Sequence, residues 1–158
     1  MRGDEKVLTE LNAALSSELT AIVQYITQSE MCSNWGYLQL AGFHKSRAID
    51  EMKHAEGIIE RILFLDGVPE IAVGLKPRPG VSAQQQLEID LEDEHDAVRQ
   101  YNASIAVCMA ALDEGSKELF EHLLKDEERH VDFLEAQLHA IAEMGIANYL
   151  SERLRDHE

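Results

Sequence analysis

Two segments of this sequence place a glutamate and a histidine three positions apart, which is close to one turn of an α-helix. The segment DEMKHAE holds Glu51 and His54, and the segment DEERHVDFLEAQL holds Glu127 and His130. Side chains at positions i and i+3 share one helix face, so both members of a pair can reach a single metal ion. Carboxylate oxygen and neutral imidazole are suitable ligands for iron. One such pair alone is more often a solvated helix surface, so the metal interpretation depends on the two pairs acting together.

Two further glutamates interrupt apolar helix stripes in the same manner. Glu18 and Glu94 stand where a stripe of leucine, isoleucine and valine would otherwise continue at steps of three and four. The interval from Glu18 to Glu51 equals the interval from Glu94 to Glu127, so the second half of the chain repeats the first at a constant offset. Four unpaired buried carboxylates would cost several kcal/mol each. Two divalent cations would balance them, so the pattern predicts a paired metal site.

Four long helices are needed to position these residues. Apolar periodicity and the turn residues between periodic segments predict helices over 5–34, 38–65, 83–112 and 116–144. Asp4 and Ser82 are the expected N-caps, Ser82 as part of a capping box with Gln85, and residues 113–115 are expected to form a tight turn. The first helix carries an expected inward stripe of Leu8, Leu11, Leu15, Leu19, Ile22 and Ile26.

One long connection, residues 66–82, contains all three prolines and three of the nine glycines. Connections beyond about 12–15 residues are uncommon in compact domains, but a strap that returns the chain along a helical bundle needs this length. The segment IANYLSERL is expected to form a short last helix. The predicted fold class is therefore all-α: a ferritin-like four-helix bundle with one long crossover and a short fifth C-terminal helix, in a single domain over residues 1–158.

Met52 faces a different direction from its neighbour Glu51. One residue is about 100° around a helix, so Met52 lies sideways with Ile49, Ile59 and Leu63 in a second apolar stripe. A second apolar face is usually buried against another subunit. From the pattern alone Met52 is either a dimer-interface side chain or a thioether ligand for haem iron.

The composition excludes several classes of partner. The chain has 158 residues and a formal net charge of −16, from 30 acidic against 14 basic residues. This balance argues against nucleic acid, which needs basic patches, and favours attraction of cations. The start MRGDEKVLTEL has no apolar run and no stretch approaches about 20 apolar residues, so neither a secretory leader nor a membrane span is expected. Cys32 and Cys108 lack metal-type spacing, and no feature requires an oxidising compartment, so a cytoplasmic protein is expected.

The chain resembles the bacterioferritin family over essentially its whole length. The similarity is carried by MRGD and NWG, by IDEMKHAEGIIERILFLDGVP and DEERHVDFLEAQL, and by MGIANYL. The resemblance implies a dinuclear iron centre with ferroxidase activity in each subunit. The implied ligands are Glu18, Glu51, His54, Glu94, Glu127 and His130. In the family pattern Glu51 and Glu127 bridge the metals, Glu18 and His54 complete one, and Glu94 and His130 complete the other.

The resemblance also implies a second cofactor and a large assembly. Met52 matches the axial ligand of haem b, supplied from both sides of a two-fold interface so that one haem serves two subunits. The family builds a homo-oligomeric shell of twenty-four subunits (a 24-mer) that stores ferric mineral. Haem is expected to assist iron release, with a ferredoxin-type electron donor as a partner.

Three other positions bear on the movement of iron and electrons. Ser46 stands where some family members carry a histidine, and His139 replaces an acid expected near a pore. Tyr25 is expected on the inward face near Glu18, where a family tyrosine donates an electron during oxidation. The alternative for Tyr25 is a packed core aromatic.

The predicted reaction oxidises two Fe(II) ions to Fe(III) with dioxygen or hydrogen peroxide. A rubrerythrin-like peroxidase is an alternative on the same bundle, although that family usually adds paired Cys-x-x-Cys motifs that this chain lacks. A haem-carrying shell subunit with an inactive iron site and a plain helical scaffold are the remaining alternatives. Neither accounts for four inward carboxylates and two histidines.

Overall fold

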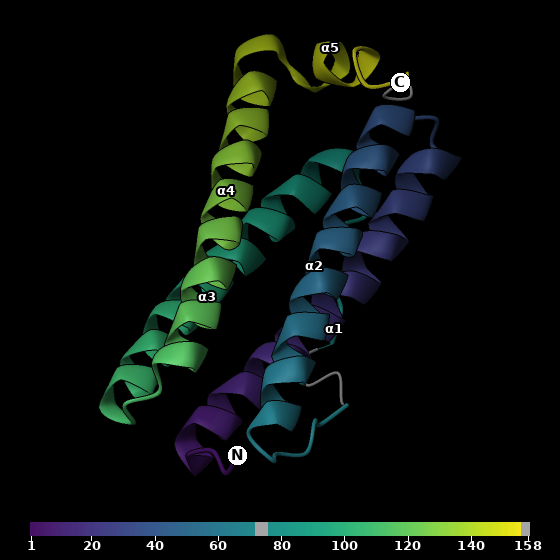
Figure 1. The fold of residues 1–158 in the computed structure, drawn as a ribbon. Coiled ribbons are helices and arrows are strands. Elements are labelled where there is room, and N and C mark those ends of the chain that lie inside the picture. The colour runs from purple at the N-terminus through teal and green to yellow at the C-terminus, as the bar shows by residue number, and fades with distance from the viewer. Residues whose placement is uncertain (72–75, 156–158) are drawn as a thin grey trace.

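The computed structural model describes residues 1–71 and 76–155, which form two helical hairpins packed side by side (Figure 1). The helices are α1 (Glu5–Asn34), α2 (Leu38–Phe64), α3 (Ala83–Ala110), α4 (Glu114–Met144) and α5 (Ile146–Ser151). Within the described residues α1 pairs with α2 and α3 pairs with α4, while α1 also packs on α3 and α2 on α4. The predicted all-α, ferritin-like bundle with a short C-terminal helix is confirmed.

Side-chain caps fix where three of the long helices begin. Asp4 accepts hydrogen bonds from the backbone N–H groups of Lys6 at 2.8 Å and Val7 at 3.2 Å. Ser82 accepts from the N–H of Gln85 at 3.2 Å, while the Gln85 side chain reaches back to the N–H of Val81 at 2.7 Å. These bonds satisfy helix N–H groups that have no partner within the helix. Both predicted N-caps are confirmed.

The predicted tight turn at residues 113–115 is wrong. The chain reverses one step earlier, where Leu112 adopts a positive φ of 57°. Asp113 is the N-cap of α4, and its carboxylate accepts from the N–H of Ser116 at 2.9 Å. An aspartate before a helix is a cap more often than a turn centre, because its side-chain oxygen satisfies free N–H groups in the first turn.

The core is divided into two apolar clusters, one toward each end of the bundle. The cluster near the N-terminus includes Leu11, Leu15, Ile58, Tyr101, Phe120 and Leu123. The other includes Cys32, Leu40, Leu87, Leu134, Ile141 and Tyr149. Each long helix contributes to both clusters, so the middle of every helix is held in place from both sides. The four predicted glutamates lie in this middle zone.

The described parts of the crossover lie along α1, as expected for a strap. Near its start, the backbone N–H of Glu70 donates to the side chain of Asn12 at 2.8 Å. Near its end, the N–H groups of Arg78 and Gly80 donate to the side chains of Gln24 and Gln28, each at 3.1 Å. The predicted strap also covers residues 72–75, which lie outside the described residues.

The inward stripe of α1 differs from the expected one at its C-terminal end. Burial follows a seven-residue spacing, with Leu11, Glu18, Tyr25 and Cys32 each at most 3% exposed. Ile26, expected to face inward, is 50% exposed. Buried positions that repeat every 3.5 residues stay on the face that packs against the neighbouring helices. A pattern that repeats every 3.6 residues moves gradually around that face. The residue next to Tyr25 therefore lies on the outside.

Five of the exposed apolar side chains of α1 and α2 form a set that we call the outer apolar residues: Val23, Ile26, Ile49, Met52 and Leu63, all 42–57% exposed. Leu38 and Phe64, the first and last residues of α2, are exposed as well. Ile49, Met52 and Leu63 of the predicted second stripe are exposed, but Ile59, predicted with them, is partly buried and packs against the apolar cluster near the N-terminus. No helix in the described part of the chain is long and apolar enough to cross a membrane.

Candidate metal centre

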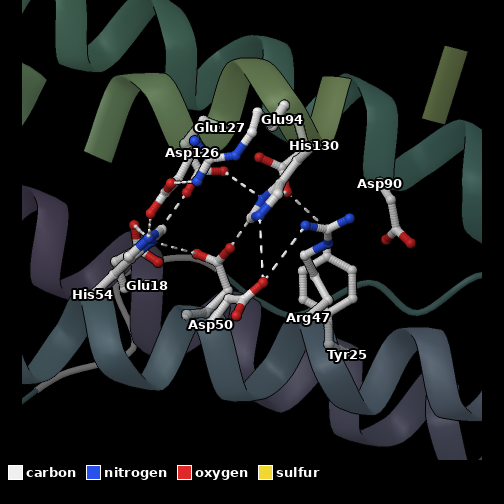
Figure 2. Close-up of polar contacts among 12 residues, drawn as sticks. Glu18, Tyr25, Arg47, Asp50, His54, Asp90, Glu94, Asp126, Glu127 and His130 are labelled. Atoms are coloured by element: carbon white, nitrogen blue, oxygen red, sulfur yellow. Dashed lines mark hydrogen bonds and ion pairs between the residues drawn. The ribbon is translucent and has the colours of Figure 1, made fainter. Parts of the chain in front are cut away.

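Each long helix contributes one glutamate to the centre of the bundle. The side chains of Glu18, Glu51, Glu94 and Glu127 are 1–4% exposed. The same zone contains His54 from α2 and His130 from α4, which are 5% and 4% exposed. Figure 2 shows the two imidazoles between α2 and α4, with carboxylates on either side.

The six side chains form two overlapping groups. Ligand atoms of Glu18, Glu51, His54 and Glu127 lie within 4.8 Å of one another, and so do those of Glu51, Glu94, Glu127 and His130. Glu51 and Glu127 belong to both groups. Two metal ions held by these groups would therefore share two carboxylates, which is the ligand pattern of ferritin-like di-iron carboxylate proteins.

Several polar atoms of the cluster have no hydrogen-bond partner within the described part of the chain: Glu18 Oε2, Glu51 Oε1, His54 Nδ1, Glu94 Oε2 and Glu127 Oε1. A buried polar atom without a partner costs about 1–3 kcal/mol, and more when charged. Five such atoms in one cluster indicate a missing positive partner. Their oxygen and imidazole chemistry suits Fe(II) and similar divalent ions.

Each histidine faces an aspartate on the opposite helix, but only His54 is within hydrogen-bond distance of it. The Nε2 of His54 lies 2.7 Å from Asp126, and the Nε2 of His130 lies 3.7 Å from Asp50. The Nδ1 atoms face the glutamates instead, at 3.2 Å from Glu127 in both cases. A histidine that donates one N–H to a carboxylate keeps its other nitrogen free as a metal ligand. Sequence reasoning missed both aspartates.

Burial and charge shift the pKa values of the cluster strongly. Burial raises the pKa of Glu51 well above its usual range, and the neighbouring Glu18 carboxylate adds to this. Burial and the charge of Glu127 raise the pKa of Glu94 to about 8. Burial opposes the charged form of His54, but the close carboxylates of Glu127, Glu18 and Glu51 outweigh it and raise the pKa of His54 to about 12.

The remaining three ligands show the same competition, and burial raises the pKa of Glu18. Burial opposes protonation of His130, but hydrogen bonds to Glu127 and Glu94 raise its pKa to about 9. Burial also opposes ionisation of Glu127, yet its close polar neighbours Glu94, His130 and His54 lower its pKa. In the protein alone, protons thus balance the buried carboxylates. Metal ions would take over this role, so their binding must release protons.

Two tyrosines donate to the cluster in a crossed arrangement. The hydroxyl of Tyr25 on α1 donates to Glu94 on α3 at 2.9 Å. The hydroxyl of Tyr101 on α3 donates to Glu18 on α1. Tyr25 is buried and inward as predicted, but its partner is Glu94 and not Glu18. Tyr101 was missed as a site residue, although it follows Tyr25 by the same offset that separates Glu94 from Glu18.

A cavity of about 340 Å³ between α1 and α3 reaches the cluster. Its wall includes Glu18, Glu94 and both tyrosines, and also Lys76 and Arg78 of the crossover. Arg78 is held to Asp93 at 2.9 Å. The end of the crossover therefore borders one opening toward the metal cluster.

A second buried polar group lies beside the centre and was also missed. Asp90 on α3 accepts from the amide of Gln28 at 2.9 and 3.0 Å and from that of Gln24 at 3.2 Å. Burial raises the pKa of Asp90 to about 8. The adjacent His44, 3.6 Å away, has its pKa lowered to about 3 by burial. At neutral pH this group therefore carries little charge.

The other predicted functional positions lie outside the cluster. Met52 is 46% exposed among the outer apolar residues. Ser46 and His139 are both exposed. The haem role of Met52 stays a prediction, because it depends on a second copy of the chain.

Comparison with known proteins identifies the class to which this fold and site belong. The profile of the ferritin-like domain matches residues 8–144. The chain is 40% identical over 152 residues to a bacterioferritin of Mycolicibacterium paratuberculosis, covering 96% of each chain. It is 44% identical over 145 residues to one of Rhodobacter capsulatus, covering 92% of this chain and 90% of the relative. The chain therefore belongs to the bacterioferritin family, and a role in iron storage follows.

Proposed function

We propose that the protein stores iron by oxidising Fe(II) at the cluster between its four long helices. The observation that carries the proposal is the overlap of two ligand groups through Glu51 and Glu127. Family membership supports iron storage and iron oxidation. The proposed ligands are Glu18, Glu51, His54, Glu94, Glu127 and His130, in one ferritin-like domain spanning residues 1–158.

The substrate of the reaction is a pair of Fe(II) ions, each of which gives up one electron. Two electrons and two protons convert dioxygen to hydrogen peroxide, or hydrogen peroxide to two waters. Four carboxylates favour the more highly charged Fe(III) product over Fe(II), because their attraction grows with cation charge. Adjacent binding of two ions allows a two-electron step without release of a one-electron oxygen radical.

The chain's own residues orient the ligands and manage protons. Asp126 holds the N–H of His54, so that Nδ1 of His54 faces the cluster. Tyr25 and Tyr101 each donate to one terminal glutamate and limit its rotation. Tyr25 is proposed as a one-electron donor in turnovers in which the oxidant takes more electrons than the bound Fe(II) supplies, with the phenol proton passing to Glu94.

Haem and assembly belong to the same proposal. Met52 lies exposed between apolar neighbours, so a second copy of the chain facing it would enclose an apolar space with two thioethers. Such a space suits haem b, one per two chains, with methionine as axial ligand. We propose a 24-mer shell built from these dimers, in the cytoplasm, with haem passing electrons from a ferredoxin-type donor for iron release.

The test is an anaerobic Fe(II) titration of the metal-free assembly, followed by admission of air. Saturation near two irons per chain and rapid oxidation are expected. Glu94→Ala should lose one of the two ions and the rapid phase. The matched control is Glu88→Ala, since Glu88 is exposed on the same helix. Weak binding without saturation, or an unchanged rate in Glu94→Ala, would refute the assignment.

A further inference from the structure

The end of the crossover brings positive charge to the wall of the cavity between α1 and α3. Among the described residues that line this cavity, Lys76 and Arg78 are the basic ones, and both belong to the crossover. The other charged residues of the wall are acidic. The position of the crossover therefore decides which charges a molecule meets as it approaches the metal cluster from this side.

Two glutamines of α1 hold the end of the crossover in place. The side chain of Gln24 accepts from the backbone N–H of Arg78 at 3.1 Å and donates to Asp93 on α3 at 2.8 Å. The side chain of Gln28 accepts from the N–H of Gly80 at 3.1 Å. Gly80 is buried, and a β-carbon added there would lie 2.4 Å from a backbone nitrogen of α3. The end of the crossover is therefore a fixed part of the cavity wall.

The guanidinium of Arg78 covers carboxylates at the outer part of the cavity. It donates to Asp93 at 2.9 Å and to Glu92 at 3.1 Å. Asp96, the other aspartate of the wall, pairs with Arg99 on the same helix. The side chains of Asp93 and Asp96 are 39% and 66% exposed, so they are the acidic groups that solvent reaches first. Each of them already has an arginine partner.

The deeper carboxylates of the wall have no such partner. Glu18 and Glu94 are 2% and 4% exposed, and one oxygen of each lacks a hydrogen-bond partner within the described part of the chain. An Fe(II) ion drawn to them through this cavity would first have to pass Arg78. In water, a unit positive charge ~6 Å from a divalent cation lowers the local concentration of that cation roughly tenfold. The same charge has little effect on an uncharged molecule such as dioxygen or hydrogen peroxide.

We propose that Arg78 is a specificity-determining residue, which makes the opening between α1 and α3 a passage for the uncharged oxidant and disfavours entry of Fe(II). The inference rests on the proposed iron oxidation, because it assigns a route to the oxidant of that reaction. Tyr25 and Tyr101 line the same cavity, so an oxidant that enters here arrives beside both phenol groups. Fe(II) then reaches the cluster from another side of the bundle.

The first test measures the rate at which the metal-free assembly binds Co(II) without oxygen, followed by the absorption of the bound ion. Arg78→Gln should bind Co(II) roughly tenfold faster at low ionic strength, and the gain should shrink as salt screens the charges. Arg78→Lys keeps the charge and should keep the natural rate. Arg2→Gln is the matched control, since it removes the same charge at an exposed position outside the cavity wall.

The second test separates selectivity for charge from a general change in structure. Oxidation of preloaded Fe(II) by hydrogen peroxide should be unchanged in Arg78→Gln, because the oxidant is uncharged. Ala21→Phe narrows the cavity, since Ala21 lies in its wall. This variant should slow oxidation by hydrogen peroxide and leave Co(II) binding unchanged. Combined with Arg78→Gln, it should abolish the gain in Co(II) binding.

Four outcomes would overturn the proposal. They are equal Co(II) rates in Arg78→Gln and the natural sequence, an equal gain in Arg2→Gln, slower Co(II) binding in Ala21→Phe, and unchanged oxidation by hydrogen peroxide in Ala21→Phe. Failure of the proposed oxidation gives a different result. A protein that binds Co(II) at the expected rates but oxidises no Fe(II) would refute the oxidation and still support the exclusion of cations by Arg78.

Discussion

The two helical hairpins carry the same residues where they meet and different residues on the outside. At the centre, the constant offset that separates Glu18 from Glu94 also matches the pairs Tyr25 and Tyr101, Asp50 and Asp126, Glu51 and Glu127, and His54 and His130. On the outside, the same offset pairs each outer apolar residue of α1 and α2 with an exposed polar or charged residue of α3 and α4. Val23, Ile26, Ile49, Met52 and Leu63 correspond to Arg99, Asn102, Lys125, Glu128 and His139.

The inward and outward residues of the hairpins meet two different requirements, namely metal binding at the centre and contact with other molecules on the outside. The centre needs two equivalent ligand groups around a shared pair of glutamates, so both hairpins keep the same inward residues. On the outside, contact with another protein requires an apolar surface on only one hairpin, here the one formed by α1 and α2. Exposed apolar side chains are common on such surfaces, whereas the matching positions of the other hairpin are polar or charged. The α3–α4 hairpin has exposed apolar side chains of its own, Met109, Phe133 and Met144, at positions that do not match the outer apolar residues.

The halves are not fully equivalent at the centre either. Asp126 lies 2.7 Å from the imidazole of His54, while Asp50 lies 3.7 Å from that of His130. The side chain of Asp126 is 15% exposed and that of Asp50 is 45% exposed. Ser46 of the first half corresponds to His122 of the second, so only one half has a histidine next to its aspartate.

The largest effect is expected from exchanging Met52, the residue that most separates the two outer surfaces. Met52→Leu keeps the apolar character and volume but removes the thioether, so haem binding should be lost while iron oxidation continues. Haem content per chain is measured from the absorption spectrum of the purified assembly. Glu128→Gln, at the matching position of the other hairpin, should retain haem. Full haem content in Met52→Leu would show that another residue is the ligand.

The second effect concerns the two aspartates behind the histidines. Asp126→Asn should weaken metal binding by about 10–100-fold, because the side chain loses its charge next to the His54 N–H. Asp50→Asn should have a smaller effect, since 3.7 Å exceeds hydrogen-bond distance. Co(II) affinity, measured by competition with a chelator, compares them. Equal losses in the two variants would mean that the halves are equivalent in function despite these distances.

Long periodic helices and the four inward glutamates could be predicted from sequence, whereas contacts between helices could not. The ends of the four long helices agree with prediction to within two residues, because apolar spacing persists over many turns. Asp126 was missed because it neighbours Glu127 at about 100° around α4, and no pattern within one helix shows that it reaches His54 on another. Tyr101 could have been found, since the repeat that pairs the glutamates also pairs it with Tyr25.

Asp90 was missed for a different reason. It lies one turn before Glu94, so it resembles one more interruption of a stripe, yet its partners Gln24 and Gln28 come from α1. Only the packed structure distinguishes a buried, hydrogen-bonded carboxyl from a metal ligand. Its counterpart in the first half, by the same offset, is Ala14, which is buried in the apolar cluster near the N-terminus. The buried carboxyl of Asp90 therefore has no counterpart in the first half of the chain.

The expected effect furthest from iron chemistry tests the Asp90 group through the pH dependence of stability. The pKa of Asp90 rises from 3.8 in a free side chain to about 8 in the folded protein, because burial disfavours its charged form. Its contribution to stability is therefore greatest below about pH 4, declines as the pH rises, and levels off above about pH 8. Asp90→Asn cannot ionise, so the metal-free variant should lose less stability than the natural sequence between pH 5 and pH 8, by on the order of 2–4 kcal/mol. Denaturant unfolding at each pH measures this difference.

Asp96→Asn is the control for this measurement, since Asp96 is exposed on the same helix and should leave the pH dependence unchanged. A natural sequence and an Asp90→Asn variant with parallel curves would mean that Asp90 is ionised when folded. In that case the amides of Gln24 and Gln28 would stabilise the carboxylate by more than burial destabilises it. The difference between the two curves thus measures which of the two effects is larger.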